Sequence, residues 1–293
     1  MAGFSEFAAR KSREAEQAHL PPFSTLEDRS ADFDLLAIGN DWSRHLYDGP
    51  FHITADRGGD VPLMSLVFVQ SRDGNTGAAN PDSLGGGPVD KHVIYEGLSR
   101  VAADGVLAGS KSVGKQSFFS VWHSQLVSLR AALGLPRHPA QVIVTGRACV
   151  DFADTLLFNV PDAPVYIIST PAGCERLEAG VKQRPHVELV RMTGDDLRAP
   201  LSFLRRERGV RRLSAIGGRT TASALIDQGL VQDVYLTTTA RNGGEPNTPF
   251  YTGTHPRDLN AVVRKEGGDR EFPMAFEHSM IVPRRNLSPA PLV

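Results

Sequence analysis

The chain has 293 residues, of which 41% are hydrophobic and 22% charged, proportions typical of a globular protein with a substantial core. Its formal net charge of −1 at pH 7 provides no overall field that would attract nucleic acid or an anionic membrane surface. Nucleic acid and membranes are therefore not expected as partners.

The remaining bulk features indicate a cytoplasmic protein. The two cysteines, Cys149 and Cys174, lack Cys-x-x-Cys spacing, so reduced thiols are expected rather than a disulfide framework. No secretory signal is recognisable, and no run approaches the roughly 18 apolar residues of a spanning helix. The nine histidines are scattered and form no paired motif, so no metal site is expected.

Residues 1–60 differ in composition from the rest of the chain. A segment with helical potential, 4–19, is followed by Pro21-Pro22 and by an acidic stretch over 26–35. Apolar residues are too sparse here for an independent core, so we predict an N-terminal arm that wraps the main domain or a partner subunit. A partly disordered tail is the alternative. Residues 61–293 are predicted to form the main domain.

From residue 61 onward, short apolar runs alternate with amphipathic segments. The apolar runs predict strands at 62–69, 106–108, 141–145, 165–169, 187–191, 213–216, 234–239 and 276–282. Helical spacing of apolar residues predicts helices over 90–104, 117–133, 173–181, 196–208 and 220–228, and the glycine-rich stretch 71–88 predicts a mobile loop. This alternation predicts an α/β fold with a largely parallel central sheet and helices on both faces.

The segment 212–230 carries the strongest functional signal. A strand is followed by Gly217 and Gly218, and then by a helix that Thr220 and Thr221 are expected to cap. Two glycines allow the backbone to approach a ligand closely, and the free N–H groups of a helix start favour an anion. With Arg219 beside them, these residues predict a phosphate cradle. An ordinary helix start after a tight turn is the alternative.

Three glycine-bearing turns, at 71–74, 109–112 and 217–220, each follow a predicted strand and are expected to meet at one edge of the sheet, where ligands bind in such folds. Asp73 lies where strand becomes loop and is the candidate functional acid. A structural Asp-Gly turn is the alternative. His123, on a predicted helix, is a second candidate proton donor, with a packed or surface histidine as the alternative.

Taken in order, these turns and their flanking strands resemble the reductase domain of the riboflavin-biosynthesis deaminase/reductases, which has a dihydrofolate reductase-like fold. The resemblance runs from about Pro62 to Tyr251. It rests on four segments: Leu66-Val-Phe-Val-Gln-Ser-Arg-Asp-Gly74, the stretch 98–109 ending in Asp-Gly-Val-Leu-Ala-Gly, Val142-Ile-Val-Thr145, and the stretch 216–236 from Ile-Gly-Gly to Gln-Asp-Val-Tyr-Leu.

The resemblance implies hydride transfer from NADPH to a pyrimidine-type substrate, as in 5-amino-6-(5-phosphoribosylamino)uracil reductase, where the ribosyl group becomes a ribityl chain. It implies that residues Gly217–Thr221 hold the cofactor phosphates and that Gln70 and Asp73 border the nicotinamide. Gly109, Ser110 and Ser112 would flank the adenosine. Arg219 would recognise the 2′-phosphate, with a solvent-exposed helix-start residue as the alternative.

The chain departs from the family pattern on the substrate side. Ile216 stands where the family usually has a substrate-contacting Glu, and 115–123 lacks the usual Asp-x-Pro-x-Leu segment. The chain also contains no zinc-deaminase motif. Two alternatives therefore stay open: a reductase of a different small substrate, such as a pterin-like one, and a nucleotide-binding protein of the same fold that has lost catalysis.

Assembly is the last prediction. The strands at 234–239 and 276–282 are apolar on more than one face, so one of them is expected at an exposed sheet edge. Such edges favour pairing with a second chain. We expect a homodimer to which residues 1–60 contribute contacts.

Overall fold

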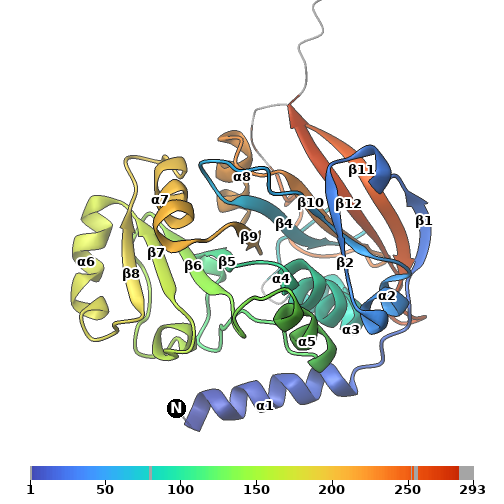
Figure 1. The fold of residues 1–293 in the computed structure, drawn as a ribbon, viewed down its shortest axis with the longest axis horizontal. Helices are drawn as coiled ribbons and strands as arrows, with labels where there is room; N and C mark the ends of the chain where they lie inside the picture. Colours follow the sequence, from blue (N-terminus) through green and yellow to red (C-terminus); the bar gives the residue numbers. More distant parts are fainter. Residues whose placement is uncertain (1, 79–80, 252, 254–256, 284–293) are drawn as a thin grey trace, which may run out of the picture.

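A computed structural model describes residues 2–78, 81–251, 253 and 257–283, and ten of its strands form one sheet (Figure 1). The strand order is β1-β11-β12-β10-β4-β9-β5-β6-β7-β8. Their bounds are β1 Ser24–Asp28, β4 Leu63–Gln70, β5 Gly105–Gly109, β6 Ala140–Thr145, β7 Val165–Ser169, β8 Val187–Arg191, β9 Arg212–Ala215, β10 Asp233–Thr239, β11 Arg257–Gly267 and β12 Met274–Pro283. A separate hairpin pairs β2 (Leu35–Ile38) with β3 (Phe51–Thr54).

The sheet from β10 to β8 is entirely parallel, whereas β12, β11 and β1 are added in antiparallel pairs. This confirms the predicted α/β fold with a largely parallel sheet. β9 is late in the chain yet inserts between β4 and β5. Because β4, β5 and β9 run parallel, their carboxyl ends point the same way, and the turns that follow them lie at the same end of the sheet.

Helices cover both faces of the sheet. One face carries α1 (Ala2–Gln17), α2 (Asp41–Tyr47), α3 (Gly87–Val89), the π-helical segment η3 (Asp90–Leu98), α4 (Ser99–Val101), α5 (Ser124–Ala132) and α6 (Pro171–Val181). The other carries α7 (Arg198–Arg208) and α8 (Arg219–Asp227). Short 3-10 turns are η1 (Ser30–Asp32), η2 (Pro81–Leu84), η4 (Ser110–Ser112) and η5 (Leu156–Asn159).

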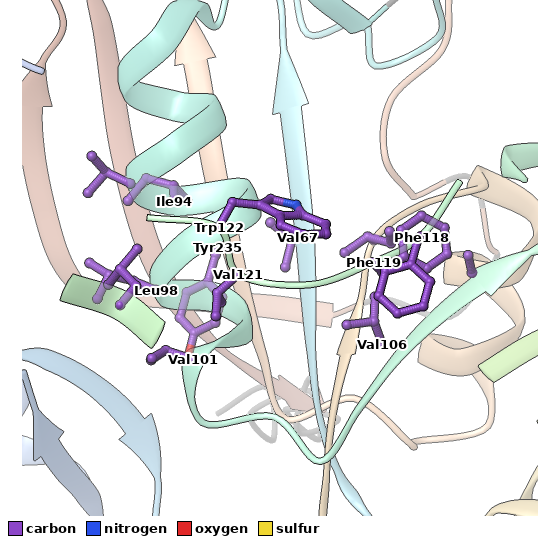
Figure 2. Packing of buried hydrophobic residues seen from close by; sticks show 14 of the residues in the cluster. Val67, Ile94, Leu98, Val101, Val106, Phe118, Phe119, Val121, Trp122 and Tyr235 are labelled. Atoms are coloured by element: carbon purple, nitrogen blue, oxygen red, sulfur yellow. The ribbon is translucent and has the colours of Figure 1, made fainter. Parts of the chain in front are cut away.

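The central strands β5, β6 and β7 are buried on both sides, which explains their largely apolar sequences. In β5, Val106 packs into the layer beneath η3 and α5, whereas its neighbour Leu107 packs into the layer beneath α7 and α8. Figure 2 shows part of the first layer, with Ile94 and Leu98 from η3 and Trp122 from the segment before α5. Of the described helices, none is both long enough and apolar enough to cross a membrane.

The predicted helix over 117–133 is only half right. α5 begins at Ser124, and residues 117–123 are extended and mostly buried. The Gln141 side chain accepts from the Phe119 N–H at 2.8 Å and donates to the Phe119 carbonyl at 2.9 Å, so it replaces the bonds of a helix. The apolar run Phe118-Phe-Ser-Val-Trp122 is therefore a buried extended segment.

Residues 2–60 pack against the rest of the chain. β1 pairs with β11 at the sheet edge, and α1 and α2 add side chains to the first core layer. The boundary placed at residue 60 stays a prediction.

The expected exposed edge was wrong. β10 lies between β4 and β12, and β12 lies between β10 and β11, so neither strand forms an edge. β1 and β8 are the edge strands. The misplacement arose because β11, rich in charged residues, was not recognised as a strand. The homodimer, which rested partly on that edge, stays a prediction.

Candidate functional site

The carboxyl end of β9 leads directly into α8 through two glycines. Gly217 has φ 136° and Gly218 has φ 80°, and side chains other than glycine rarely adopt such values. Gly218 is the N-cap of α8, and no side chain caps the helix. The predicted threonine cap is therefore wrong. Because the first N–H groups of α8 have no capping side chain, they are available to an anion.

The loop after β5 meets this helix start. A Cβ on Gly109 would lie 2.7 Å from Thr221 Oγ1. A Cβ on Gly218 would lie 3.5 Å from both Ser112 Oγ and Thr221 Oγ1, and one on Gly217 would lie 3.9 Å from Ser112 Oγ. The two turns thus form one surface of glycine backbone and hydroxyl groups, which we call the cradle: Gly109, Ser112, Gly217, Gly218 and Thr221.

Several polar groups of the cradle region are free. Within the described part of the chain, the side-chain hydroxyls of Ser110, Ser112 and Thr221 make no hydrogen bond, and Arg219 makes neither a hydrogen bond nor an ion pair. Arg219 is half-buried, whereas Thr220 is exposed. The region therefore offers hydroxyl donors and one unpaired guanidinium, which suit a phosphate group.

An open cleft of about 460 Å³ adjoins the cradle at Ser110. It is lined by Val113 and Lys115 from the loop after β5 and by Cys149, Val150 and Phe158 from the segment after β6. The Lys115 Nζ is held 2.6 Å from the Asp154 carboxylate. The cleft lies within the usual size range of small-molecule pockets and has the usual mixture of apolar walls and a few polar groups.

Gln70 ends β4 at the same edge of the sheet. β4 pairs with β9 only as far as Leu66 and Ala215, so Gln70 extends four residues beyond that pairing. Its Nε2 donates to Thr238 Oγ1 at 3.0 Å. Gln70 therefore lies on the β10 side of the crevice and is not one of the residues that meet in the cradle.

Asp73 joins two loops. Its carboxylate accepts hydrogen bonds from Ser71 Oγ at 2.6 Å, Asn75 Nδ2 at 3.0 Å and the Gly243 N–H at 3.3 Å. The hydrogen bond from Ser71 is the main cause of its lowered pKa, so Asp73 is a stable carboxylate. These contacts, with Gly74 at φ 82°, match the structural turn that was the alternative. A catalytic role for Asp73 stays a prediction.

The loop after β10 was missed from sequence. Gly243 and Thr248 pair with the loop after β4: the Gly243 carbonyl accepts from Ser71 Oγ at 2.9 Å, and the Thr76 N–H donates to the Thr248 carbonyl at 2.7 Å. The loop therefore forms a wall of the crevice beside β4. Only its Asn-Gly-Gly turn, 242–244, could have signalled it.

His123 lies among helices rather than on one. It is the N-cap of α5, stacks on Trp42 with ring centroids 3.9 Å apart, and lies 3.5 Å from the Glu16 carboxylate. Burial lowers its pKa. These contacts match the alternative interpretation, in which His123 is a packed histidine rather than a proton donor. Among the residues that the structure describes, no three His, Cys, Asp or Glu side chains gather as a metal site would require.

Comparison with known proteins agrees with this geometry. Residues 62–261 match the family described as the RibD C-terminal domain. Among solved structures, a pyrimidine reductase-like protein from Corynebacterium diphtheriae is 19% identical with a TM-score of 0.60, and the alignment covers 75% of this chain and 92% of that one. The search of curated proteins gives no match.

Two further proteins share the fold. RibD from Acinetobacter baumannii is 14% identical with a TM-score of 0.57, covering 78% of this chain but only 60% of RibD. The riboflavin biosynthesis reductase Rib7 from Saccharomyces cerevisiae is 15% identical with a TM-score of 0.50, covering 77% and 92%. The family match spans the parallel sheet and the cradle. The chain therefore belongs to the RibD C-terminal domain family, with its dihydrofolate reductase-like fold.

Proposed function

We propose that the protein is an NADPH-dependent reductase that resembles 5-amino-6-(5-phosphoribosylamino)uracil reductase and acts on a pyrimidine-type substrate. The observation that carries this proposal is the cradle, where glycine backbone and free hydroxyls meet an uncapped helix start. Membership of the RibD C-terminal domain family supports it. When bound, NADPH would supply the hydride.

The residues present fit such a cofactor. Gly217 and Gly218 leave the backbone open where a pyrophosphate must come close, and Ser112 and Thr221 add hydroxyl donors. Arg219 would bind the 2′-phosphate. The cleft beside Ser110 would hold the adenosine, and Gln70, at the end of β4, would border the nicotinamide.

The contribution of this chain to the reaction would be binding and orientation. The loops after β4 and β10 are fastened together through Asp73, so they form a firm wall that holds the substrate in place and limits the access of water. Because Asp73 is held as a carboxylate, its role there would be positional rather than proton donation.

The position at which the family usually contacts its substrate supports a second candidate function. Ile216 is buried, with 7% of its surface exposed, and its N–H donates to the Leu107 carbonyl at 3.0 Å. No carboxylate is therefore offered at this position. A pocket that loses a hydrogen-bonding group usually changes what it binds, so a different small substrate, such as a pterin-like one, is the alternative. We also propose a cytoplasmic homodimer.

Two measurements test the proposal. Titration with NADPH, followed by its fluorescence, should show saturable binding. Single-turnover oxidation of NADPH should then occur with the ribosylamino-pyrimidine phosphate. Binding without turnover on pyrimidine or pterin substrates would support a nucleotide-binding protein that has lost catalysis. Absence of NADPH binding would refute the proposal.

A further inference from the structure

The helix α1 lies outside the residues matched by the family and packs on a segment that leads from the cradle (Figure 1). The Phe4 ring lies 4.7 Å from that of Phe118, and the Phe7 ring lies 5.5 Å from that of Trp122, centroid to centroid. Phe118 and Trp122 are buried and belong to the extended segment 117–123. α1 thus covers a part of the core that would otherwise face water.

The same extended segment continues backwards into residues 110–117, which we call the cradle loop. Residues 114–116 are exposed, and the backbone bonds inside the loop are local: Val113 N–H to the Ser110 carbonyl, and Ser117 N–H to the Gly114 carbonyl. Such bonds set the shape of the loop but do not fix it to the sheet. Its position must therefore come from neighbouring elements.

Two elements hold the cradle loop. On one side, the Leu156 N–H donates to the Lys115 carbonyl at 2.9 Å, the Leu157 N–H donates to the Ser117 carbonyl at 3.1 Å, and Lys115 Nζ pairs with Asp154. On the other, Arg10 Nη2 of α1 donates to Gln116 Oε1 at 3.1 Å. α1 is itself anchored at its far end, where Glu16 Oε1 accepts from the Ser124 N–H at 2.6 Å. The helix therefore connects the start of α5 to the cradle loop.

The cradle loop carries hydroxyls that reach the other half of the cradle. Ser112 Oγ would lie 3.9 Å from a Cβ on Gly217 and 3.5 Å from a Cβ on Gly218. Binding groups of this kind must be held within about 0.5 Å of their working positions. A shift of the loop would therefore separate the two halves of the cradle, even though α1 touches neither.

We propose that α1 is a strap that positions the cradle loop, with Phe7 on Trp122 and Arg10 on Gln116 as its positioning residues. Loss of the Phe7 contact would free the loop and weaken binding of a dinucleotide phosphate. The statement about the ligand rests on the proposed function, whereas the statement about loop order does not.

The test compares the truncation of two aromatic residues in the full chain, the half-buried Phe7 and the buried Phe23. Phe7→Ala removes the strap contact, and Phe7→Leu restores an apolar side chain. Phe23→Ala is the control, because Phe23 is an aromatic residue that is more buried than Phe7 and packs on Tyr47 and Phe276, next to the edge strand β1. Unfolding curves identify conditions under which all variants are folded.

Without ligand, amide hydrogen exchange over residues 110–117 should become at least tenfold faster in Phe7→Ala and stay unchanged in Phe23→Ala. With NADPH as the probe, Kd should rise about tenfold in Phe7→Ala, recover in Phe7→Leu, and stay within twofold in Phe23→Ala. If Phe7→Ala only destabilised the protein and did not loosen the cradle loop in particular, amide exchange would become faster over the whole domain.

Unchanged loop exchange in folded Phe7→Ala would overturn the proposal, as would an equal loss of affinity in Phe23→Ala. If Phe7→Ala does not fold, Arg10→Met removes the bond to Gln116 and keeps the aromatic contact. Faster exchange over 110–117 in that variant supports the strap, and unchanged exchange refutes it. If wild-type protein does not bind NADPH, the proposed function fails while the exchange result still decides the strap.

Discussion

Substituting alanine for Gly109 places a methyl group against the hydroxyl of Thr221. Gly109 has φ −72° and ψ 146°, an extended conformation that alanine adopts without strain. The cost must therefore come from the contact itself. The added Cβ would lie 2.7 Å from Thr221 Oγ1, whereas the next atom, Thr221 Cβ, is 3.8 Å away at ordinary contact distance.

This geometry fixes the expected size of the effect. Introducing a methyl group into a packed contact costs about 1–3 kcal/mol of unfolding free energy. The cost of Gly109→Ala should be at the lower end of this range because the Thr221 side chain can rotate away. In a Thr221→Ala background the close oxygen is gone, so the same Gly109→Ala change should cost less than about 0.5 kcal/mol. The two substitutions should thus be coupled by about 1 kcal/mol.

Urea unfolding of the wild type, both single variants and the double variant measures this coupling. The m-values should agree across the four proteins. If the two substitutions were additive within about 0.3–0.5 kcal/mol, Gly109 and Thr221 would not be in contact, and the reasoning that joins the two halves of the cradle would be refuted.

Three further predictions concern the ligand and pH. Gly218→Val should abolish NADPH binding while circular dichroism shows a retained fold, because a branched side chain blocks the backbone at φ 80°; normal affinity would contradict this. Arg219→Ala should narrow a preference for NADPH over NADH worth about 1.5–3 kcal/mol, and an unchanged ratio of the two Kd values would assign the 2′-phosphate to another residue. Burial lowers the pKa of His92 and His138 from 6.5 to about 4. Because the unfolded chain binds more protons between these values, stability should fall as pH drops from 6.5 to 4, and His138→Gln should reduce that loss in urea unfolding.

The parallel half of the fold could be predicted from the sequence because its strands are buried on both faces. A continuous apolar run such as that of β7 has few other interpretations, and its predicted bounds, 165–169, agree with the structure. The bounds predicted for β8, 187–191, also agree, although Glu188 interrupts its apolar run. β11 was missed because Arg264, Lys265 and Glu266 interrupt any apolar pattern. Its place in the sheet comes from pairing with β12 and β1, which local sequence does not encode.

The candidate site, too, could be predicted from the sequence only in part. The Gly217-Gly218 turn was recognisable because a strand, two glycines and a helix follow one another directly. The contact of Asp73 with Gly243 spans 170 residues of sequence, so the fastening of the two loops could not be read from either segment. The extended segment 117–123 was mistaken for helix because its stabilising partner, Gln141, lies in a later strand.

A crystal structure of the protein with NADP⁺ tests the central claim most directly. We expect pyrophosphate oxygens about 3 Å from backbone N–H groups of residues 218–221, with a hydrogen bond donated to them by the hydroxyl of Ser112 or Thr221. A dinucleotide bound elsewhere, or a pyrophosphate without contact to the start of α8, would contradict it.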